Sequence, residues 1–198
     1  MKQWVILILL FCCSLSFGQT ILIVGDSLTE GYGLDPSEAY PVQLEILLKA
    51  QGHPSAKGVN GGISGSTTAS GVQRVKWYAK LKPQILVLAL GANDGLRGLK
   101  VADSQKNLEA TILAAQAAGM KVLLAGMQMP VNYGAAYRKE FEAMYTTLSK
   151  KFKVPLMPFM LAGVGGVPKL NLADGMHPNA EGQKIVAGNI LRGLKGHL

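Results

Sequence analysis

The chain has 198 residues, of which 48% are hydrophobic and 16% are charged, and its formal net charge is +8 at pH 7. This length and composition exclude a disordered chain and predict one globular domain with a sizeable core. The lysines are scattered and no aromatic residues alternate with them, which argues against nucleic-acid binding. We interpret the charge as a solvated surface. The alternative interpretation gives this positive charge a function, namely weak adsorption of the protein to anionic lipid at a membrane surface.

Residues 1–18 differ from the rest of the chain and predict a signal peptide. A lysine precedes an apolar run, and the small residues Ser16 and Gly18 have the spacing that signal peptidase requires. We therefore expect cleavage before Gln19 and export to the periplasm or the medium, with residues 19–198 as a single domain. The apolar run is shorter than the roughly 20 residues of a transmembrane helix. An uncleaved anchor or a buried first helix is the weaker alternative.

Both cysteines, Cys12 and Cys13, fall within this first segment. A bulky residue precedes each of them where lipid attachment requires a small one, so a lipoprotein is disfavoured. The mature chain would contain no cysteine. It would therefore have no disulfide, no thiolate metal ligand and no cysteine nucleophile.

Apolar runs rich in β-branched residues alternate along the chain with segments of helical periodicity. This alternation predicts a parallel sheet with helices on both faces, joined by right-handed crossovers. The predicted strands are Ile21–Val24, a short strand from Val59, Ile85–Leu90, Lys121–Gly126 and Val154–Phe159. The predicted helices are Pro36–Ala50, a segment with Val72, Val75, Tyr78 and Leu81 on one face, a segment from a cap at Asp103 or Ser104 to Ala118, a segment ending at about Phe152, and a segment after Asn179.

Two of the predicted helices carry apolar residues that we expect to face the core. The fifth predicted strand contains Pro155 and Pro158, which suits an edge of the sheet. The apolar faces consist of Val42, Leu44, Ile46, Leu47 and Leu48 in the first predicted helix and of Ile185, Val186, Ile190 and Leu194 in the last.

Polar residues follow four of the predicted strands at their carboxyl ends, where ligands bind in sheets of this type. Ser27 follows the first strand and Gly65 lies in the loop after the second. Asn93 follows the third strand and His177 comes after the fifth. Because these strand ends share one edge of a parallel sheet, we expect the four residues to converge on one site.

Ser27 is the candidate nucleophile of this site. A serine hydroxyl needs an adjacent base, and the chain has three histidines. His53 lies in a predicted surface turn and His197 is next to the C-terminus, where we expect fraying. His177 follows Asp174 by three residues, a spacing at which the carboxylate can accept the Nδ1 proton and turn Nε2 toward the serine. The alternative is a capped turn with a satisfied histidine.

Negative charge that develops on a substrate oxygen would need fixed hydrogen-bond donors. The candidates are the backbone N–H of Ser27, the backbone N–H of Gly65 and the side-chain amide of Asn93. The alternative roles are a turn at Gly65 and a cap at Asn93. The sequence lacks the spacings of a P-loop, a dinucleotide-binding loop, an α/β-hydrolase elbow and a zinc-protease helix. Serine chemistry of this kind requires no metal and no cofactor.

Four short motifs occur in order along the chain: Gly25-Asp26-Ser27-Leu28, Ile63-Ser64-Gly65, Gly91-x-Asn93-Asp94 and Asp174-x-x-His177. This ordered set resembles the four blocks of the GDSL, or SGNH, hydrolase family and spans nearly all of the mature chain. The resemblance implies a three-layer α/β/α sandwich with a flavodoxin-like, parallel five-stranded sheet. It implies Ser27 as nucleophile, His177 as base and Asp174 as its orienting acid. Ser27, Gly65 and Asn93 would then form the oxyanion hole.

Three further segments are similar to the bacterial thioesterase I, lysophospholipase L1 and arylesterase subgroup: Gly31-Tyr32-Gly33, Gly95-Leu96-Arg97-Gly98 and Pro130-Val131-Asn132-Tyr133-Gly134. The subgroup implies a carboxylic ester hydrolase that acts on small acyl esters, thioesters or lysophospholipids through an acyl-enzyme. Two alternatives stay open, a carbohydrate O-acetylesterase with the same triad and a non-catalytic ligand-binding module.

The apolar loop over residues 127–133 is expected to hold the acyl chain, and residues 163–172 could border it. The residues that we expect to contact substrate are Asp26, Asp94, Met129, Pro130, Asn132 and Tyr133.

Overall fold

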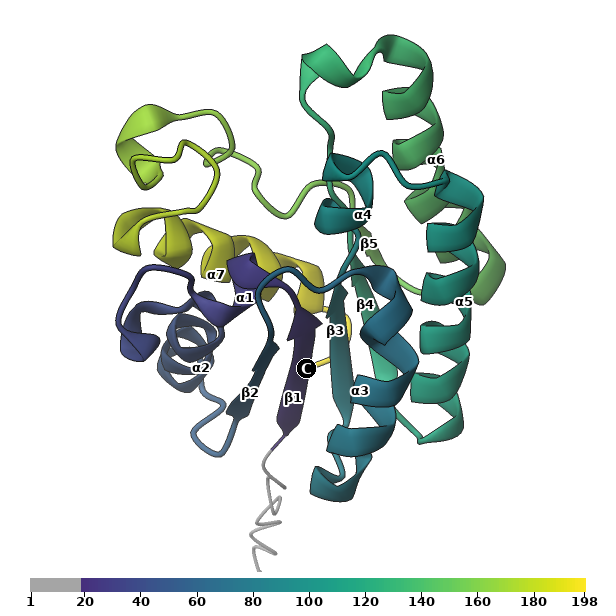
Figure 1. Ribbon diagram of the computed structural model, residues 1–198. Coiled ribbons are helices and arrows are strands. Elements are labelled where there is room, and N and C mark those ends of the chain that lie inside the picture. Colours follow the sequence, from purple (N-terminus) through teal and green to yellow (C-terminus); the bar gives the residue numbers. More distant parts are fainter. Residues whose placement is uncertain (1–18) are drawn as a thin grey trace, which may run out of the picture.

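The computed structural model describes residues 19–198, and the predicted signal peptide lies outside them. A five-stranded parallel sheet lies between two layers of helices (Figure 1), which is the predicted three-layer α/β/α arrangement. In the order β2-β1-β3-β4-β5, its strands are β2 (Lys57–Gly62), β1 (Thr20–Gly25), β3 (Ile85–Ala89), β4 (Lys121–Ala125) and β5 (Leu156–Met157). The α-helices are α1 (Ser27–Glu30), α2 (Tyr40–Ala50), α3 (Gly71–Tyr78), α4 (Ala92–Leu96), α5 (Val101–Ala117), α6 (Ala135–Phe152) and α7 (Ala180–Leu194). Short 3₁₀ helices cover Pro36–Glu38, Thr68–Ser70, Ala79–Leu81, Val131–Tyr133 and Pro168–Leu170.

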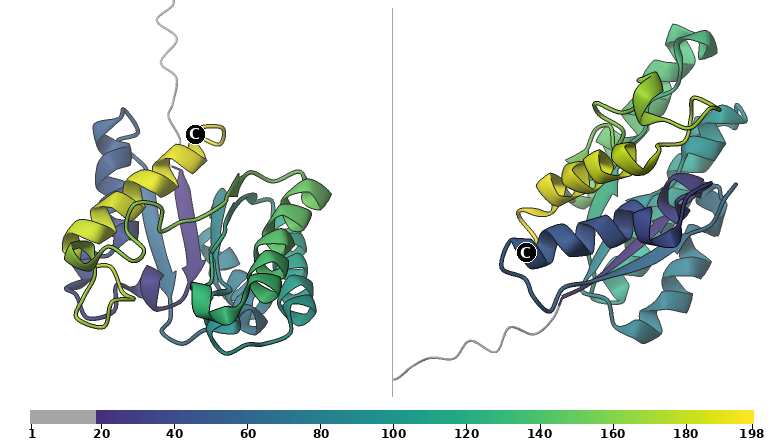
Figure 2. Two further views of the ribbon diagram at one scale, coloured as in Figure 1. Left: turned by 90° about the horizontal axis from the view of Figure 1, so that it is seen from above. Right: turned by 90° about the vertical axis from the view of Figure 1, so that its left-hand side faces the viewer.

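The two faces of the sheet are covered by different helices (Figure 2). Helices α2 and α7 pack against each other on one face, whereas α3, α5 and α6 line the other. The central strands β1, β3 and β4 are buried on both sides, which is why their sequences are continuous apolar runs. Within residues 19–198 no helix combines the length and the apolarity needed to cross a bilayer.

The order of the strands reverses at β1. The chain passes from β1 to β2 on one side and then returns to β3 on the other side of β1. In open α/β sheets such a reversal creates a crevice beyond the carboxyl ends of the two diverging strands. Helix α1 follows β1 and helix α4 follows β3, so both begin at this crevice.

Strand β5 is shorter than the predicted strand of residues 154–159. It pairs with β4 through Leu156 and Met157 alone. Pro155 and Pro158 flank these two residues and have no N–H group to donate to the ladder. The predicted position at the edge of the sheet is confirmed.

The predicted helix over residues 36–50 is divided in two. Ala39 has an extended backbone and separates the 3₁₀ helix from α2. Leu44 and Leu48 are fully buried, whereas Val42 and Ile46 are exposed, which corrects the predicted apolar face. Positions two residues apart lie on opposite sides of a helix, so the two pairs cannot both face the core.

The last helix needs a similar correction, because Ile185 in α7 is exposed while its predicted partners Val186, Ile190 and Leu194 are buried. Helix α5 begins at Val101 and not at a cap formed by Asp103 or Ser104.

Candidate active site

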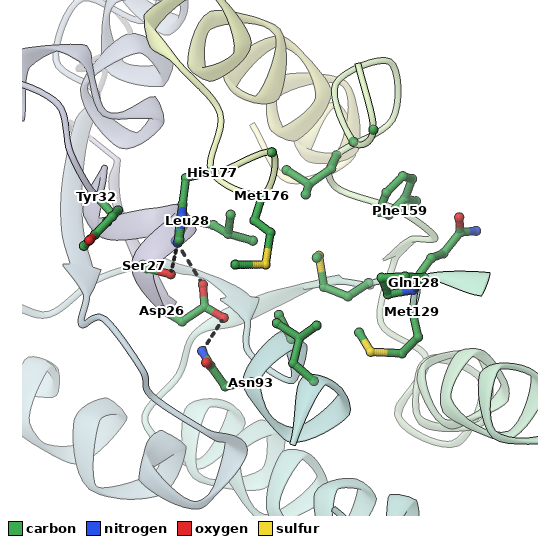
Figure 3. A pocket seen from close by; sticks show the side chains of 18 of the residues that line it. Asp26, Ser27, Leu28, Tyr32, Asn93, Gln128, Met129, Phe159, Met176 and His177 are labelled. Atoms are coloured by element: carbon green, nitrogen blue, oxygen red, sulfur yellow. Dashed lines mark hydrogen bonds between the residues drawn. The ribbon is translucent and has the colours of Figure 1, made fainter. Parts of the chain in front are cut away.

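The site is built around the junction of β1 and α1. The Oδ1 of Asp26 caps α1 by accepting a hydrogen bond from the backbone N–H of Leu28 at 3.0 Å. Ser27 is thereby held at the first helical position, with its hydroxyl directed at His177 (Figure 3). A Cβ atom at Gly25 would overlap the hydroxyl of Thr29, so the close turn before the serine requires glycine.

Ser27 and His177 come together although they are 150 residues apart in the chain. The Nε2 of His177 lies 2.9 Å from the Oγ of Ser27, and the Nδ1 lies 2.6 Å from the Oδ2 of Asp174. The Oδ1 of Asp174 accepts hydrogen bonds from the backbone N–H groups of His177 and Met176. These bonds, above all the one from His177, lower the pKa of Asp174 to about 2. An ionised Asp174 accepts the Nδ1 proton, which leaves Nε2 free to accept the serine proton.

His197 lies near the amino ends of the strands, whereas Ser27 follows a carboxyl end. Its backbone carbonyl accepts hydrogen bonds from Nε2 of Gln19 at 3.3 Å and from Nζ of Lys121 at 3.4 Å. Gln19 and Lys121 lie at the amino ends of β1 and β4, so these bonds place His197 beside those ends. Its position excludes it as the base for Ser27.

The three residues that carry the predicted oxyanion donors line the same cavity. Gly65 has a φ of 74°, a conformation that favours glycine, and its carbonyl accepts a hydrogen bond from Arg97 at 2.9 Å. The Nδ2 of Asn93 lies 3.1 Å from the carbonyl oxygen of Ser66. Within residues 19–198, the backbone N–H groups of Ser27 and Gly65 have no hydrogen-bond acceptor. They are therefore available to a bound oxyanion.

Asp26 is a buried carboxyl group next to the serine, with 1% of its surface exposed. Burial is the largest cause of the rise of its pKa from the ordinary value of 3.8 to about 6. Its Oδ2 lies 3.4 Å from the Nδ2 of Asn93 (Figure 3). The neighbouring Arg74 donates to the carbonyl oxygen of Gly25 at 2.7 Å. Asp26 thus connects the serine turn to the Asn93 amide.

Asp94 is buried and has a structural role. Its Oδ1 accepts hydrogen bonds from the hydroxyls of Thr68 and Ser104 at 2.6 and 3.0 Å, and its Oδ2 accepts one from the backbone N–H of Thr68 at 2.9 Å. In the described part of the chain, Asp94 is not part of the cavity wall. The predicted contact with substrate is therefore corrected, because its carboxylate ties the loop after β2 to α4 and α5.

A cavity of about 600 Å³ extends from Ser27 and His177. Met129 and Phe159 lie at the end far from these two residues (Figure 3). The predicted residue Pro130 also lines the cavity. The apolar part of the wall includes Leu28, Leu96, Met127, Met129, Phe159 and Leu161.

Two of the predicted substrate contacts lie elsewhere. Among residues 19–198, the wall does not include Asn132 or Tyr133. The hydroxyl of Tyr133 donates to the carbonyl oxygen of Leu96 at 2.9 Å, which ties the loop after β4 to α4. This correction leaves residues 127–130 as the part of the predicted acyl loop that reaches the cavity.

Sequence reasoning missed several residues of the wall. The sequence predicts that Phe159 belongs to the fifth strand, but β5 ends at Met157, so Phe159 and Leu161 lie beyond it and line the cavity. Gly165, by contrast, lies in the segment 163–172, which is expected to border the acyl chain, and it lines the cavity. Tyr32 has its ring centroid 4.6 Å from that of His177. The signal in the sequence for Tyr32 is its place between Gly31 and Gly33.

Comparisons with known proteins agree with this geometry. Residues 23–185 match the GDSL-like Lipase/Acylhydrolase family. The chain is 42% identical over 178 residues to esterase TesA of Pseudomonas aeruginosa, covering 89% of this chain and 88% of that protein. It is 37% identical over 169 residues to thioesterase 1/protease 1/lysophospholipase L1 of Escherichia coli K12, covering 85% and 79%.

A solved structure is similar as well. It is the psychrotrophic esterase EstA from Pseudoalteromonas sp., inhibited by monoethylphosphonate, with a TM-score of 0.84 and 32% identity over 90% of this chain and 97% of that one. The fold and the relatives define a carboxylic ester hydrolase with the SGNH architecture. The chain belongs to the GDSL-like lipase/acylhydrolase family, which confirms the resemblance seen in its sequence motifs.

Proposed function

We propose that this protein is an exported serine esterase in which Ser27, His177 and Asp174 form the catalytic triad. The observation that carries the proposal is the continuous chain of hydrogen bonds from Ser27 Oγ through the imidazole to the Asp174 carboxylate, at 2.9 and 2.6 Å. We propose acyl esters, thioesters and lysophospholipids as its substrate class. Similarity to an esterase and to a thioesterase/lysophospholipase supports this class.

The reaction passes through a covalent acyl-enzyme. The Oγ of Ser27 attacks the acyl carbonyl carbon while Nε2 of His177 takes the hydroxyl proton. The tetrahedral intermediate then collapses, and Nε2 gives this proton to the departing alkoxide or thiolate. Water repeats the sequence on the acyl-serine and releases the carboxylic acid. Asp174 stays ionised throughout and stabilises the imidazolium.

The oxyanion of each tetrahedral intermediate accepts hydrogen bonds from the N–H groups of Ser27 and Gly65 and from the Asn93 amide. The contact between Asn93 and Asp26 is 3.4 Å long and therefore weak. The hydrogen in this contact is the one that the Asn93 amide offers to the oxyanion, while its other hydrogen stays on the carbonyl oxygen of Ser66 at 3.1 Å. The apolar end of the cavity takes the acyl chain, where each buried methylene adds about 0.8 kcal/mol.

We also propose that residues 1–18 direct export and are removed. Strand β1 begins at Thr20, one residue after the proposed N-terminus at Gln19, and the buried side chains of the described residues form one hydrophobic core. Residues 19–198 would then form a single hydrolase domain of the exported protein. N-terminal sequencing of the exported protein should begin at Gln19, and a longer N-terminus would contradict the proposed cleavage.

Covalent labelling tests the proposed nucleophile. We expect a fluorophosphonate to form one adduct per chain, which peptide mass spectrometry should locate on Ser27. Ser27→Ala should prevent labelling and lower aryl-ester hydrolysis by about a million-fold with an unchanged circular dichroism spectrum, because triad residues act as a unit.

Ser64→Ala is the matched control. Ser64 lines the same cavity but makes its hydrogen bonds to Glu30, so this variant should still be labelled. An adduct on another residue, or activity of Ser27→Ala within a hundredfold of the wild type, would contradict the triad. A non-catalytic binding module would not react at all.

A further inference from the structure

Large apolar side chains are exposed around the mouth of the cavity. Six of them follow the carboxyl ends of strands, at the edge of the sheet that holds Ser27. The exposed fraction of Val131 is 80%, and that of Met176 is 55%. We call this set the mouth ring: Tyr32, Ile63, Leu96, Leu99, Val131 and Met176.

The mouth ring is continuous with the cavity. Tyr32, Leu96 and Met176 line the cavity itself. Ile63 and Val131 are each next in sequence to a residue of the cavity wall. Five of the six residues of the ring therefore line the cavity or adjoin a residue of its wall.

Neither the core nor the bound acyl chain accounts for the whole ring. Val131 and Leu99 are outside the cavity wall in the described part of the chain, yet both leave apolar surface in water. Single exposed apolar residues are common on proteins, but a contiguous group beside a binding site indicates an interaction surface. A partner with an apolar interior would remove this apolar surface from water.

Basic residues are interleaved with this apolar surface. In the segment Leu96-Arg97-Gly98-Leu99-Lys100 all five residues are exposed. Arg97 and Lys100 are in none of the ion pairs found among residues 19–198. The carboxylates of Glu30 and Asp174, which contact the cavity wall, are hydrogen-bonded to Ser64 and His177.

Charge complementarity therefore selects an anionic partner. The full sequence has a formal net charge of +8, and the charge stays positive without Lys2, so its sign is that of Arg97 and Lys100. An anionic bilayer presents negative headgroups to the cations and an apolar interior to the side chains between them.

We propose that the mouth ring docks the enzyme on bilayers that contain anionic phospholipid, so that acyl substrates enter the cavity from the lipid surface. The entry of substrate rests on the proposed function, whereas docking requires no chemistry at Ser27. Val131 and Leu99 insert among the acyl chains, and Lys100 contacts the headgroups.

Vesicle binding tests the proposal. The protein is produced from the full-length gene, and mass spectrometry verifies that all variants have the same N-terminus. Cosedimentation is measured with vesicles of phosphatidylcholine alone and with vesicles that also contain phosphatidylglycerol. We expect the wild type to bind the anionic vesicles at least tenfold more strongly.

Variants then locate the binding surface. Val131→Ser combined with Leu99→Ser should weaken binding to anionic vesicles about tenfold, because two apolar side chains no longer leave water. Lys100→Gln should weaken it about fivefold on anionic vesicles and leave neutral vesicles unaffected. The matched control combines Ile46→Ser with Leu113→Ser, two side chains on α2 and α5 that are 54% and 50% exposed, and should bind like the wild type.

Two readouts separate docking from catalysis. Both double variants should hydrolyse p-nitrophenyl acetate in lipid-free buffer like the wild type, which shows that they are folded, and Ser27→Ala should bind vesicles like the wild type. Equal binding of the wild type to both vesicle types would overturn the proposal. So would equal losses in the ring and control variants, or full binding by the ring variant. Loss of the proposed function alone would appear as unlabelled Ser27 with vesicle binding intact.

Discussion

The polar end of the cavity, around Ser27 and His177, is held by directional hydrogen bonds, whereas the apolar end, around Met129 and Phe159, is formed by packed side chains (Figure 3). Displacing a polar group breaks a hydrogen bond, which requires a defined length and angle. Reshaping an apolar wall changes volume and contact area gradually. We therefore expect changes at the polar end to abolish the reaction and changes at the apolar end to alter which substrate is preferred.

The polar end of the cavity also contains a group that lowers the folding stability of the protein. Burial of the Asp26 carboxyl raises its pKa to about 6, so keeping it ionised at neutral pH opposes folding. The apolar end has no such cost, because its side chains gain from leaving water. Four predictions test this contrast, beginning with the largest effect.

Asp174→Asn should lower kcat/KM for aryl esters by about 10⁴-fold. An amide in this position favours the wrong tautomer of His177, so that Nε2 can no longer accept the serine proton. Steady-state kinetics with p-nitrophenyl butyrate measures the loss. Asp103→Asn, an exposed aspartate in the first turn of α5, is the control and should behave like the wild type. A loss of less than tenfold would show that Asp174 does not orient the histidine.

Asn93→Ala should lower kcat by about 10²- to 10³-fold and leave KM nearly unchanged. The amide would interact with the oxyanion of the transition state more strongly than with the ground-state carbonyl. Separate determination of kcat and KM checks this, since the opposite pattern, a raised KM with an unchanged kcat, would identify Asn93 as a residue for substrate binding only.

Asp26→Asn should remove a pH dependence of stability. The pKa of Asp26 in the folded state is about 6, above the ordinary value of 3.8, so the folded state binds the proton more tightly. Its contribution is fully present below 3.8 and is lost as pH rises through 6, a difference on the order of 3 kcal/mol.

Urea unfolding at several pH values between 4 and 7 measures this contribution. The free energy of unfolding of the wild type, relative to Asp26→Asn, should decrease with rising pH across this range. Asn retains an oxygen that can accept the Leu28 N–H bond, so the comparison isolates the charge. Parallel curves for the two proteins would contradict the shifted pKa of Asp26.

Phe159→Ala should lower kcat/KM for p-nitrophenyl octanoate and dodecanoate about tenfold, because the acyl chain loses an apolar contact. Hydrolysis of the acetate ester by the same variant serves as the control and should change little. An equal loss on all chain lengths would exclude Phe159 from the acyl site. A preference of the wild type for acetate would instead favour a carbohydrate O-acetylesterase.

Much of the polar end could be predicted from the sequence. Nucleophilic chemistry demands particular residue types, and the chain offers few histidines, so Asp174 and His177 could be selected by their spacing. Asp94 shows the limit of such reasoning. Its motif placed it near the site, but only the structure shows that its oxygens are bonded to Thr68 and Ser104.

The apolar end could not be predicted with the same detail. Phe159 and Leu161 are apolar residues that could equally have formed a core or a strand. The same ambiguity affected Val42 and Ile185, which were expected in the core and are exposed. Hydrophobicity predicts that a side chain tends to leave water, but it does not specify which neighbour covers it.

By itself the sequence determined the alternation of strands and helices, the family and the residues that could act as nucleophile, base and acid. These features depend on local periodicity and on residue type, which are readable along the chain. Only the tertiary structure decided which apolar residues pack in the core, which line the cavity and which form the mouth ring. That choice depends on how segments far apart in the chain approach one another, because burial is a property of the folded surface and not of a residue.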